Sequence, residues 1–168
     1  SPIRQYVTID QKNPDRYIVA LSQGGLGLPE REYYLRDDPS LAQIREKYVA
    51  HIGRMLALAG VPDAAAQAQV VMDLETQIAR RHWPIAKRRE RELTYNLRTR
   101  EELDRLAPAY PWHAQLAPAG TDTQKHYVVR ELDAVEGIGK LFLQTPVEHW
   151  RSYLTYHLLA TSASVLPK

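Results

Sequence analysis

The sequence predicts a mainly α-helical fold, a multi-helix domain with a small antiparallel β pair near the N-terminus. Apolar residues recur every three or four positions through three long stretches after residue 38, which is the helical period. Residues that start and stop helices flank those stretches. Before residue 23, the helical spacing is absent, and two short runs rich in β-branched and aromatic residues predict strands. We expect residues 1–168 to form a single helical domain, with strands and a glycine-rich corner in 1–35 and helices in 36–168.

The β pair comes first in the chain. Residues 6–10 alternate, and residues 17–21 form a β-rich run. Asn13–Pro14–Asp15 lies between the two runs and predicts the turn. Two strands are only marginally stable by themselves, so this pair must pack on helices.

The stretch from Gln23 to Leu35 reads QGGLGLPEREYYL and joins the strands to the helices. Its glycines allow positive φ, so we expect at least one of the three to adopt it. The adjacent tyrosines point in different directions, so only one should be deeply buried, with its hydroxyl hydrogen-bonded. A dinucleotide-phosphate loop is excluded because the third glycine of G-x-G-x-x-G is absent. The structural motif comprises Gly24, Gly25, Gly27, Pro29, Arg31, Tyr33 and Tyr34.

Three long helices are predicted, over residues 39–59, 63–82 and 146–165. Asp38 can cap the first, and Pro39 suits its first helical position. The last begins at the capping box Thr145–Glu148 and carries apolar residues as far as Val165.

Glu75 stands at the edge of the apolar stripe of the second long helix. A lone glutamate could serve as a general base, but no acid or histidine stands near it in the sequence. We therefore expect Glu75 to pair with Arg80 or Arg81 on a neighbouring turn.

Shorter elements follow the second helix. The basic run 87–92 contains two glutamates and no aromatic residue, which favours a solvated helix face over nucleic-acid binding. Thr99–Glu102 is a capping box for a short helix. Three prolines predict irregular structure over 107–124, and residues 126–129 predict a strand before a helix over 132–141. Trp83 and Trp112 are candidate surface contacts, because an exposed tryptophan usually indicates a partner.

Composition sets wide bounds on function. Hydrophobic residues make up 44% of the chain and charged residues 25%, and the net charge of +2 favours neither nucleic acid nor membrane as a partner. The absence of cysteine excludes disulfides and thiolate metal sites. No apolar run reaches the ~18 residues of a spanning helix, so we expect no membrane segment.

The segment Q-x-x-L-G-L-P-x-R-E-Y-Y at residues 23–34 resembles the neprilysin and endothelin-converting-enzyme family of zinc metallopeptidases. The resemblance continues through V-M-D-L-E at 71–75, I-A at 78–79 and Y-N at 95–96. Trp112, Trp150 and the Tyr153–Leu154 pair also match the family. The match runs from about Asn13 to Val165.

The family's catalytic motif H-E-x-x-H is missing from this chain, and no two of its six histidines are four residues apart. The resemblance implies an internal piece of a longer peptidase, from the non-catalytic helical part that encloses the substrate cavity and restricts access to small peptides. It implies zinc in the parent enzyme, the catalytic domain of the same polypeptide and peptide substrates as partners, and a periplasmic, cell-envelope or secreted location. For this chain alone we predict no catalytic residue, no metal or cofactor site, and no peptidase activity.

The alternative is a stand-alone helical module that binds proteins or peptides without enzyme activity, using Trp83, Trp112 and the glycine-rich corner as its contact surface.

Overall fold

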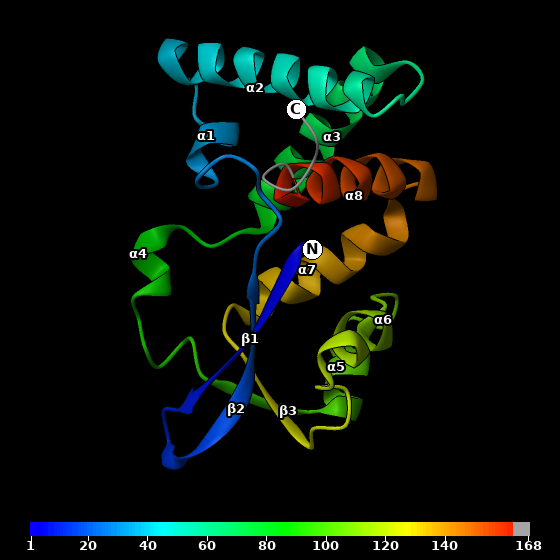
Figure 1. Ribbon diagram of the computed structural model, residues 1–168. Coiled ribbons are helices and arrows are strands. Elements are labelled where there is room, and N and C mark those ends of the chain that lie inside the picture. The colour runs from blue at the N-terminus through cyan, green and yellow to red at the C-terminus, as the bar shows by residue number, and fades with distance from the viewer. Residues whose placement is uncertain (163–168) are drawn as a thin grey trace. The chain divides into compact units, whose positions relative to one another are not determined.

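The structure is a computed structural model, and it describes residues 1–162. Helices account for 56% of these residues, and the strands form one four-stranded mixed sheet. The mainly helical class is therefore confirmed, whereas the sheet is larger than the predicted pair. The chain divides into two compact units (Figure 1). The helical unit contains Ser1, Leu26–Arg80 and the chain from Thr145, and the sheet unit contains Pro2–Gly25 and Arg81–Gln144.

In the sheet unit, β1 (Ile3–Asp10) and β2 (Asn13–Gln23) form the predicted antiparallel pair. The turn differs from the prediction. It lies at residues 11–12, and Asn13 and Pro14 already belong to β2. The hairpin is correspondingly longer than the two short runs of β-forming residues indicate.

Two further strands complete the sheet in the order β1-β2-β4-β3. The predicted strand at 126–129 is confirmed as β4 (His126–Val129), which runs parallel to β2. Its other neighbour is the antiparallel β3 (Asn96–Thr99). Pairing such as Val19 with Tyr127 joins residues about a hundred positions apart, and local sequence signals carry no information on it.

Four α-helices and a 3₁₀ turn occur in the sheet unit: α4 (Ile85–Arg88), α5 (Arg100–Leu106), α6 (Trp112–Leu116), η1 (Ala117–Ala119) and α7 (Leu132–Gln144). The capping box at Thr99 and Glu102 is confirmed. The irregular stretch predicted over 107–124 is wrong in part, since α6 and η1 lie within it. The helix in the basic run is shorter than predicted, because α4 ends at Arg88 and turns follow it.

The central strands of the sheet are buried on both faces. On one face, Ala20 of β2 and Val128 of β4 are paired and are 2% and 6% exposed. The opposite face carries larger buried side chains. Val19 and Leu21 of β2 and Tyr127 and Val129 of β4 share this face by register and are at most 4% exposed. The Tyr127 hydroxyl donates to the Thr121 carbonyl oxygen at 2.7 Å, so the segment after η1 covers the same face.

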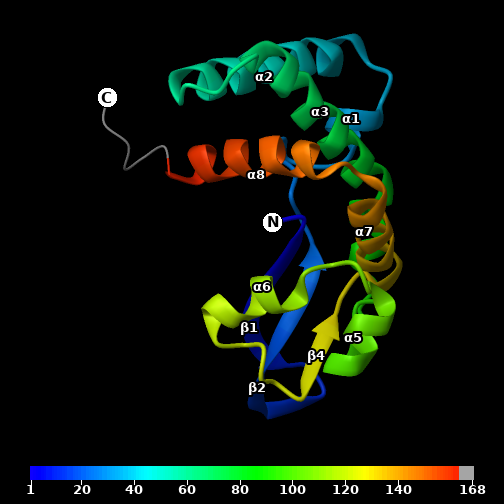
Figure 2. The same ribbon diagram turned by 90° about the vertical axis from the view of Figure 1, so that its right-hand side faces the viewer.

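The helical unit consists of α1 (Glu32–Leu35), α2 (Pro39–Leu58), α3 (Ala64–Arg81, whose last residue belongs to the sheet unit) and α8 (Val147–Ser162). Helix α2 packs along α8, and α1 packs against α2 (Figure 2). The three long helices match their predicted spans to within a few residues, and residues 163–165 of the last prediction lie outside the described part. The predicted cap is confirmed, since the Asp38 carboxylate accepts from the backbone N–H groups of Ser40 and Leu41. None of the helices in residues 1–162 combines the length and apolar character that crossing a bilayer requires.

A buried carboxylate closes the end of the hairpin. Asp10 accepts hydrogen bonds from the backbone N–H of Lys12 at 2.9 Å, from Arg16 Nε at 2.8 Å and from the Tyr95 hydroxyl at 2.8 Å. Burial acts to raise the pKa of Asp10, but these bonds outweigh it and hold the pKa below its usual value. The ionised form is therefore favoured by the fold.

Replacing Asp10 with asparagine should destabilise the protein at neutral pH and have less effect in acid. A carboxyl whose pKa is depressed by folding stabilises the protein above its unfolded pKa, which is about 3.9. That contribution is lost as the pH falls through the folded pKa. Thermal unfolding of wild type and Asp10→Asn from neutral to strongly acidic pH tests this, and a midpoint difference that stays constant with pH would contradict it.

Candidate functional site

The glycine-rich corner begins with a left-handed turn. Gly25 has φ of 81°, which confirms that one of the three glycines adopts positive φ. Gly24 precedes it, with its N–H donating to the Pro2 carbonyl and its own carbonyl 3.0 Å from His82 Nε2. Backbone and side chain together hold this part of the corner within the sheet unit.

Replacing Gly25 with alanine should cost about 1 kcal/mol or more of unfolding free energy, because an L side chain resists this backbone conformation. Gly53→Ala is the matched control. Gly53 lies inside α2, and a Cβ there would meet the Ala68 Cβ at an ordinary 3.7 Å. Denaturant unfolding should show a loss for Gly25→Ala and none for Gly53→Ala, and equal stability of both variants would refute the argument.

Further along the corner, Gly27 contacts the carboxylate of Glu75, a residue that is 0% exposed. Its Oε2 accepts from the backbone N–H of Gly27 at 3.1 Å and from the Tyr34 hydroxyl at 2.5 Å. The Tyr48 hydroxyl lies 3.0 Å from both carboxylate oxygens, and His157 Nε2 lies 2.8 Å from Oε1. We call Gly27, Tyr34, Tyr48, Glu75 and His157 the Glu75 network. Its members come from the corner and from α1, α2, α3 and α8.

The two tyrosines keep their protons in this network. Burial and the negative charge of Glu75 raise the pKa of Tyr34 far above its usual value, and the same causes raise the pKa of Tyr48. Both hydroxyls therefore act as donors, and Tyr34 also accepts from the Leu28 N–H at 2.8 Å. A carboxylate offers about four acceptor positions, which these donors fill. The arrangement bonds one residue each from the corner, α1, α2 and α8 to a single buried carboxylate on α3.

This finding corrects the expectation that Glu75 pairs with Arg80 or Arg81. Arg81 instead donates from Nε to the Gly137 carbonyl. The helical spacing contained a signal for the true position, since Glu75 lies four residues after Val71 and three before Ile78, both fully buried. The sequence does not show that Tyr48 and His157, distant along the chain, are its partners.

The remaining corner residues tie α1 to its neighbours. Arg31 Nε donates to the Ala79 carbonyl in α3, and Arg45 of α2 donates to the carbonyl of Tyr33 at 2.9 Å. Tyr34 is 5% exposed with a bonded hydroxyl, and Tyr33 is only partly buried, so the prediction of one deeply buried tyrosine is confirmed. Pro29 is exposed in the turn before α1.

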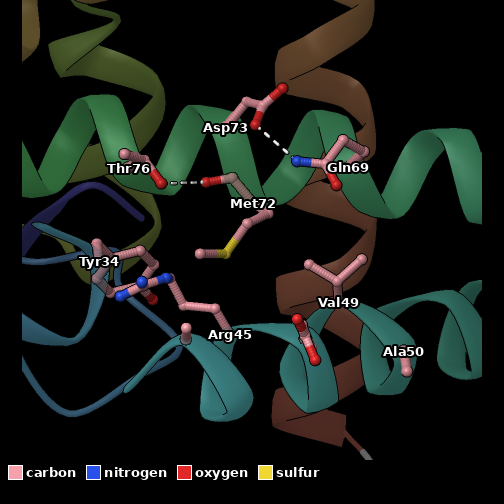
Figure 3. Close-up of a pocket in the computed structure, with 10 residues that line it drawn as sticks. Tyr34, Arg45, Val49, Ala50, Gln69, Met72, Asp73 and Thr76 are labelled. Atoms are coloured by element: carbon pink, nitrogen blue, oxygen red, sulfur yellow. Dashed lines mark hydrogen bonds between the residues drawn. The ribbon is translucent and has the colours of Figure 1, made fainter. Parts of the chain in front are cut away.

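Beside the network, a groove of about 630 Å³ runs between α2 and α3 (Figure 3). Val49 and Ala50 of α2 face Met72 and Thr76 of α3 across it, and the Tyr34 ring lines one end. Its polar residues include Arg45, Glu46, Gln69 and Asp73. A concave surface of this size can accept a peptide side chain.

The sequence model of an M13 peptidase N-terminal region, described as "Peptidase family M13", matches residues 1–168. The chain belongs to peptidase family M13. Endothelin-converting enzyme 1 from Cavia porcellus is 30% identical to this M13 chain over 167 residues, and the human enzyme is also 30% identical. Each alignment covers 96% of this chain but 22% of the enzyme, so the chain spans about a fifth of the length of these relatives.

Solved structures show the same fold. The zinc metalloprotease Zmp1 of Mycobacterium tuberculosis in its open state superposes with a TM-score of 0.90 at 33% identity, over 100% of this M13 chain and 26% of Zmp1. PepO from Lactobacillus rhamnosis superposes with a TM-score of 0.82 at 20% identity, which supports the fold alone. The M13 region described here is thus homologous to the corresponding part of Zmp1.

The two tryptophans proposed as surface contacts of this M13 chain are buried. Trp83 is 8% exposed, and its indole N–H donates to Asp133. Trp112 is 2% exposed, and its indole N–H lies within 3.2 Å of the carbonyl oxygens of Leu103 and Ala107. Each ring can be buried in the sheet unit because its one polar atom, the indole nitrogen, is hydrogen-bonded there. The prediction of surface contacts is wrong, and the stand-alone binding module loses those two residues.

The other polar clusters of the M13 chain can be compared with the ligand sets that metal ions require. Among residues 1–162, no group of three histidine, cysteine, aspartate or glutamate side chains could hold a metal ion. In the basic run, Arg88 pairs with the buried Glu131 at 2.9 Å and Lys87 lies 3.5 Å from Asp133. These two cations therefore have partners within the sheet unit.

Proposed function

We propose that this chain is the non-catalytic helical portion of a neprilysin-type zinc endopeptidase, where it helps to enclose the substrate cavity and restricts access to small peptides. The match to an M13 N-terminal model over all 168 residues carries the proposal. The superposition on Zmp1, with a TM-score of 0.90, supports it. The partners are the catalytic domain of the same polypeptide and the peptides that the parent enzyme cleaves.

The Glu75 network supports a role as a wall of a cavity. A wall that excludes large substrates must keep its shape, and one buried carboxylate bonded from four elements opposes their separation. The described residues do not fit a zinc site. Zinc and the reacting groups of the parent enzyme therefore belong to the catalytic domain in this proposal.

The test uses the complete polypeptide that contains this chain. Its reading frame should encode an H-E-x-x-H motif, and the purified enzyme should contain zinc. A short fluorogenic peptide and the same peptide within a long unstructured extension are then compared. The proposal predicts that kcat/KM for the extended substrate is lower by about tenfold or more, because a closed cavity admits it poorly. Equal values, or a reading frame without the motif, would refute the proposal.

One variant tests whether the helical unit sets the size limit for substrates without taking part in the cleavage reaction. Glu75→Ala should loosen the helical unit and reduce the discrimination between the two substrates, while the zinc content and the cleavage of the short peptide change less. Arg80→Ala is the control, because Arg80 is exposed on the same helix and does not line the groove between α2 and α3. If Glu75→Ala left the discrimination unchanged, this unit would not set the size limit.

A further inference from the structure

The hairpin exposes an apolar surface that the sheet unit does not cover. Val7 is 60% exposed, Ile9 53% and Tyr17 76%. Ile9 lies directly opposite Tyr17, and Val7 lies opposite Val19, so these side chains share one face of the sheet. We call Val7, Ile9 and Tyr17 the hairpin patch.

The hairpin patch continues one of the two buried faces of the sheet. Val19 and Leu21 stand on the same face and are 4% and 0% exposed, next to Tyr127 and Val129 of β4. The apolar pattern thus extends along the hairpin beyond the point where the unit's own residues cover it. Contiguous exposed apolar surface on a folded protein usually marks an interaction site.

The same strand is an edge strand, and its outer side is covered at one end, where the Ile3 carbonyl accepts from Gln115 Nε2 at 2.8 Å. Beyond that end, the register places the backbone groups of Gln5, Val7 and Ile9 on the outer side. β1 lies at one end of the strand order, and no strand among residues 1–162 pairs with its outer side. Every second residue of an edge strand directs its N–H and C=O away from the neighbouring strand. Natural edge strands are protected by lysine, proline or bulges, but the eight residues of β1, IRQYVTID, contain neither lysine nor proline. Its one irregularity lies at the end near the turn, between Ile9 and Asp10.

We infer that an extended apolar segment of the same polypeptide, from outside these 168 residues, lies along β1 and covers the hairpin patch. The inference rests on the proposed function in one respect, that this chain is part of a longer peptidase. The lengths of the relatives support the same polypeptide as the source. This chain covers 22% of endothelin-converting enzyme 1 and 26% of Zmp1, so the larger part of each protein lies outside the matched region. The segment should alternate apolar and polar residues, place apolar side chains over Val7 and Ile9, and bond to the outward backbone groups of β1.

Hydrogen exchange on the complete polypeptide tests the inference. The outward amides of Gln5, Val7 and Ile9 in β1 should exchange at least about 100-fold more slowly than in an unfolded chain, because a paired amide exchanges only after opening. Protection should be the same over a wide dilution series. Exchange at unprotected rates would overturn the inference, as would protection that disappears on dilution, since the occupant would then be a second copy of the chain.

Substitutions provide a second measurement. In the complete polypeptide, Val7→Lys and Ile9→Lys should each reduce the protection of the outward β1 amides by about tenfold or more, because a covered site cannot hold an unpaired charge. Thr8→Lys is the matched control on the opposite face of the same strand and should change protection little. If all three variants kept full protection, the hairpin patch would be solvated and the inference wrong. Discrimination by substrate length is a separate readout, so failure of the proposed function is recognised independently.

Discussion

Replacing Glu75 with alanine should destabilise the protein by about 3–5 kcal/mol, the largest effect that we expect from a single substitution. The hydroxyls of Tyr34 and Tyr48 would lose their acceptor in the interior of the helical unit, and the N–H of the exposed Gly27 would lose its acceptor as well. His157 Nε2 would lose its partner as well. A cavity the size of the removed side chain would add to the loss. Denaturant unfolding followed by intrinsic fluorescence measures the change in free energy.

Two further substitutions test whether lost hydrogen bonds cause the destabilisation by Glu75→Ala. Glu75→Gln keeps the shape and one acceptor oxygen and should lose less than Glu75→Ala, though still about 1–3 kcal/mol, because its amide group faces existing donors. Asp73→Ala, exposed on the same helix, should stay within about 0.5 kcal/mol of wild type. If Glu75→Ala lost no more than Asp73→Ala, the hydrogen bonds of the Glu75 network would contribute nothing to stability.

The second large effect is expected from Gly27→Ala, at about 2–4 kcal/mol. A Cβ on Gly27 would lie 1.8 Å from the Tyr48 hydroxyl oxygen and 2.7 Å from the ring carbon that carries it. Tyr48 would have to move and would release its hydrogen bonds to Glu75. Gly27 is exposed, so the cost arises from the neighbouring side chain and not from burial of the glycine.

A double-mutant cycle isolates that clash. Tyr48→Phe removes the oxygen nearest to the new Cβ, so Gly27→Ala should cost about 1 kcal/mol less in the Tyr48→Phe background than in wild type. Unfolding free energies of the wild type, the two single variants and the double variant give the coupling directly. Additive effects would show that the cost of Gly27→Ala has another origin.

The elements with strong local signals were predicted from the sequence. Pro39 and the Asp38 cap set the start of α2, and the Thr99–Glu102 capping box set the start of α5. A positive-φ glycine in the corner and one deeply buried tyrosine of the pair also followed from the residue types alone. Each of these features depends on interactions within a few residues, which the sequence displays directly.

Three errors concern residues that the structure buries. Local spacing predicted that Glu75 pairs with Arg80 or Arg81, and the amphipathic character of tryptophan made Trp83 and Trp112 candidate surface contacts. All three side chains are buried. Distant partners such as His157 for Glu75 and Asp133 for Trp83 account for two of the errors, whereas Trp112 bonds to carbonyl oxygens only five and nine residues before it. Polar atoms can be buried only where such partners meet them.

The sequence by itself therefore determined the helical class, the approximate spans of the long helices within residues 1–162, the antiparallel pairing of the first two strands and the family resemblance. Only the tertiary structure decided that β4 joins β2 to extend the sheet, that Glu75 gathers one donor from each of several elements, and that Gly27 faces Tyr48. The physical reason is the range of the interactions. Caps, turns and periodicity act over a few residues, whereas strand pairing and the burial of a charge depend on groups brought together from distant positions by the fold.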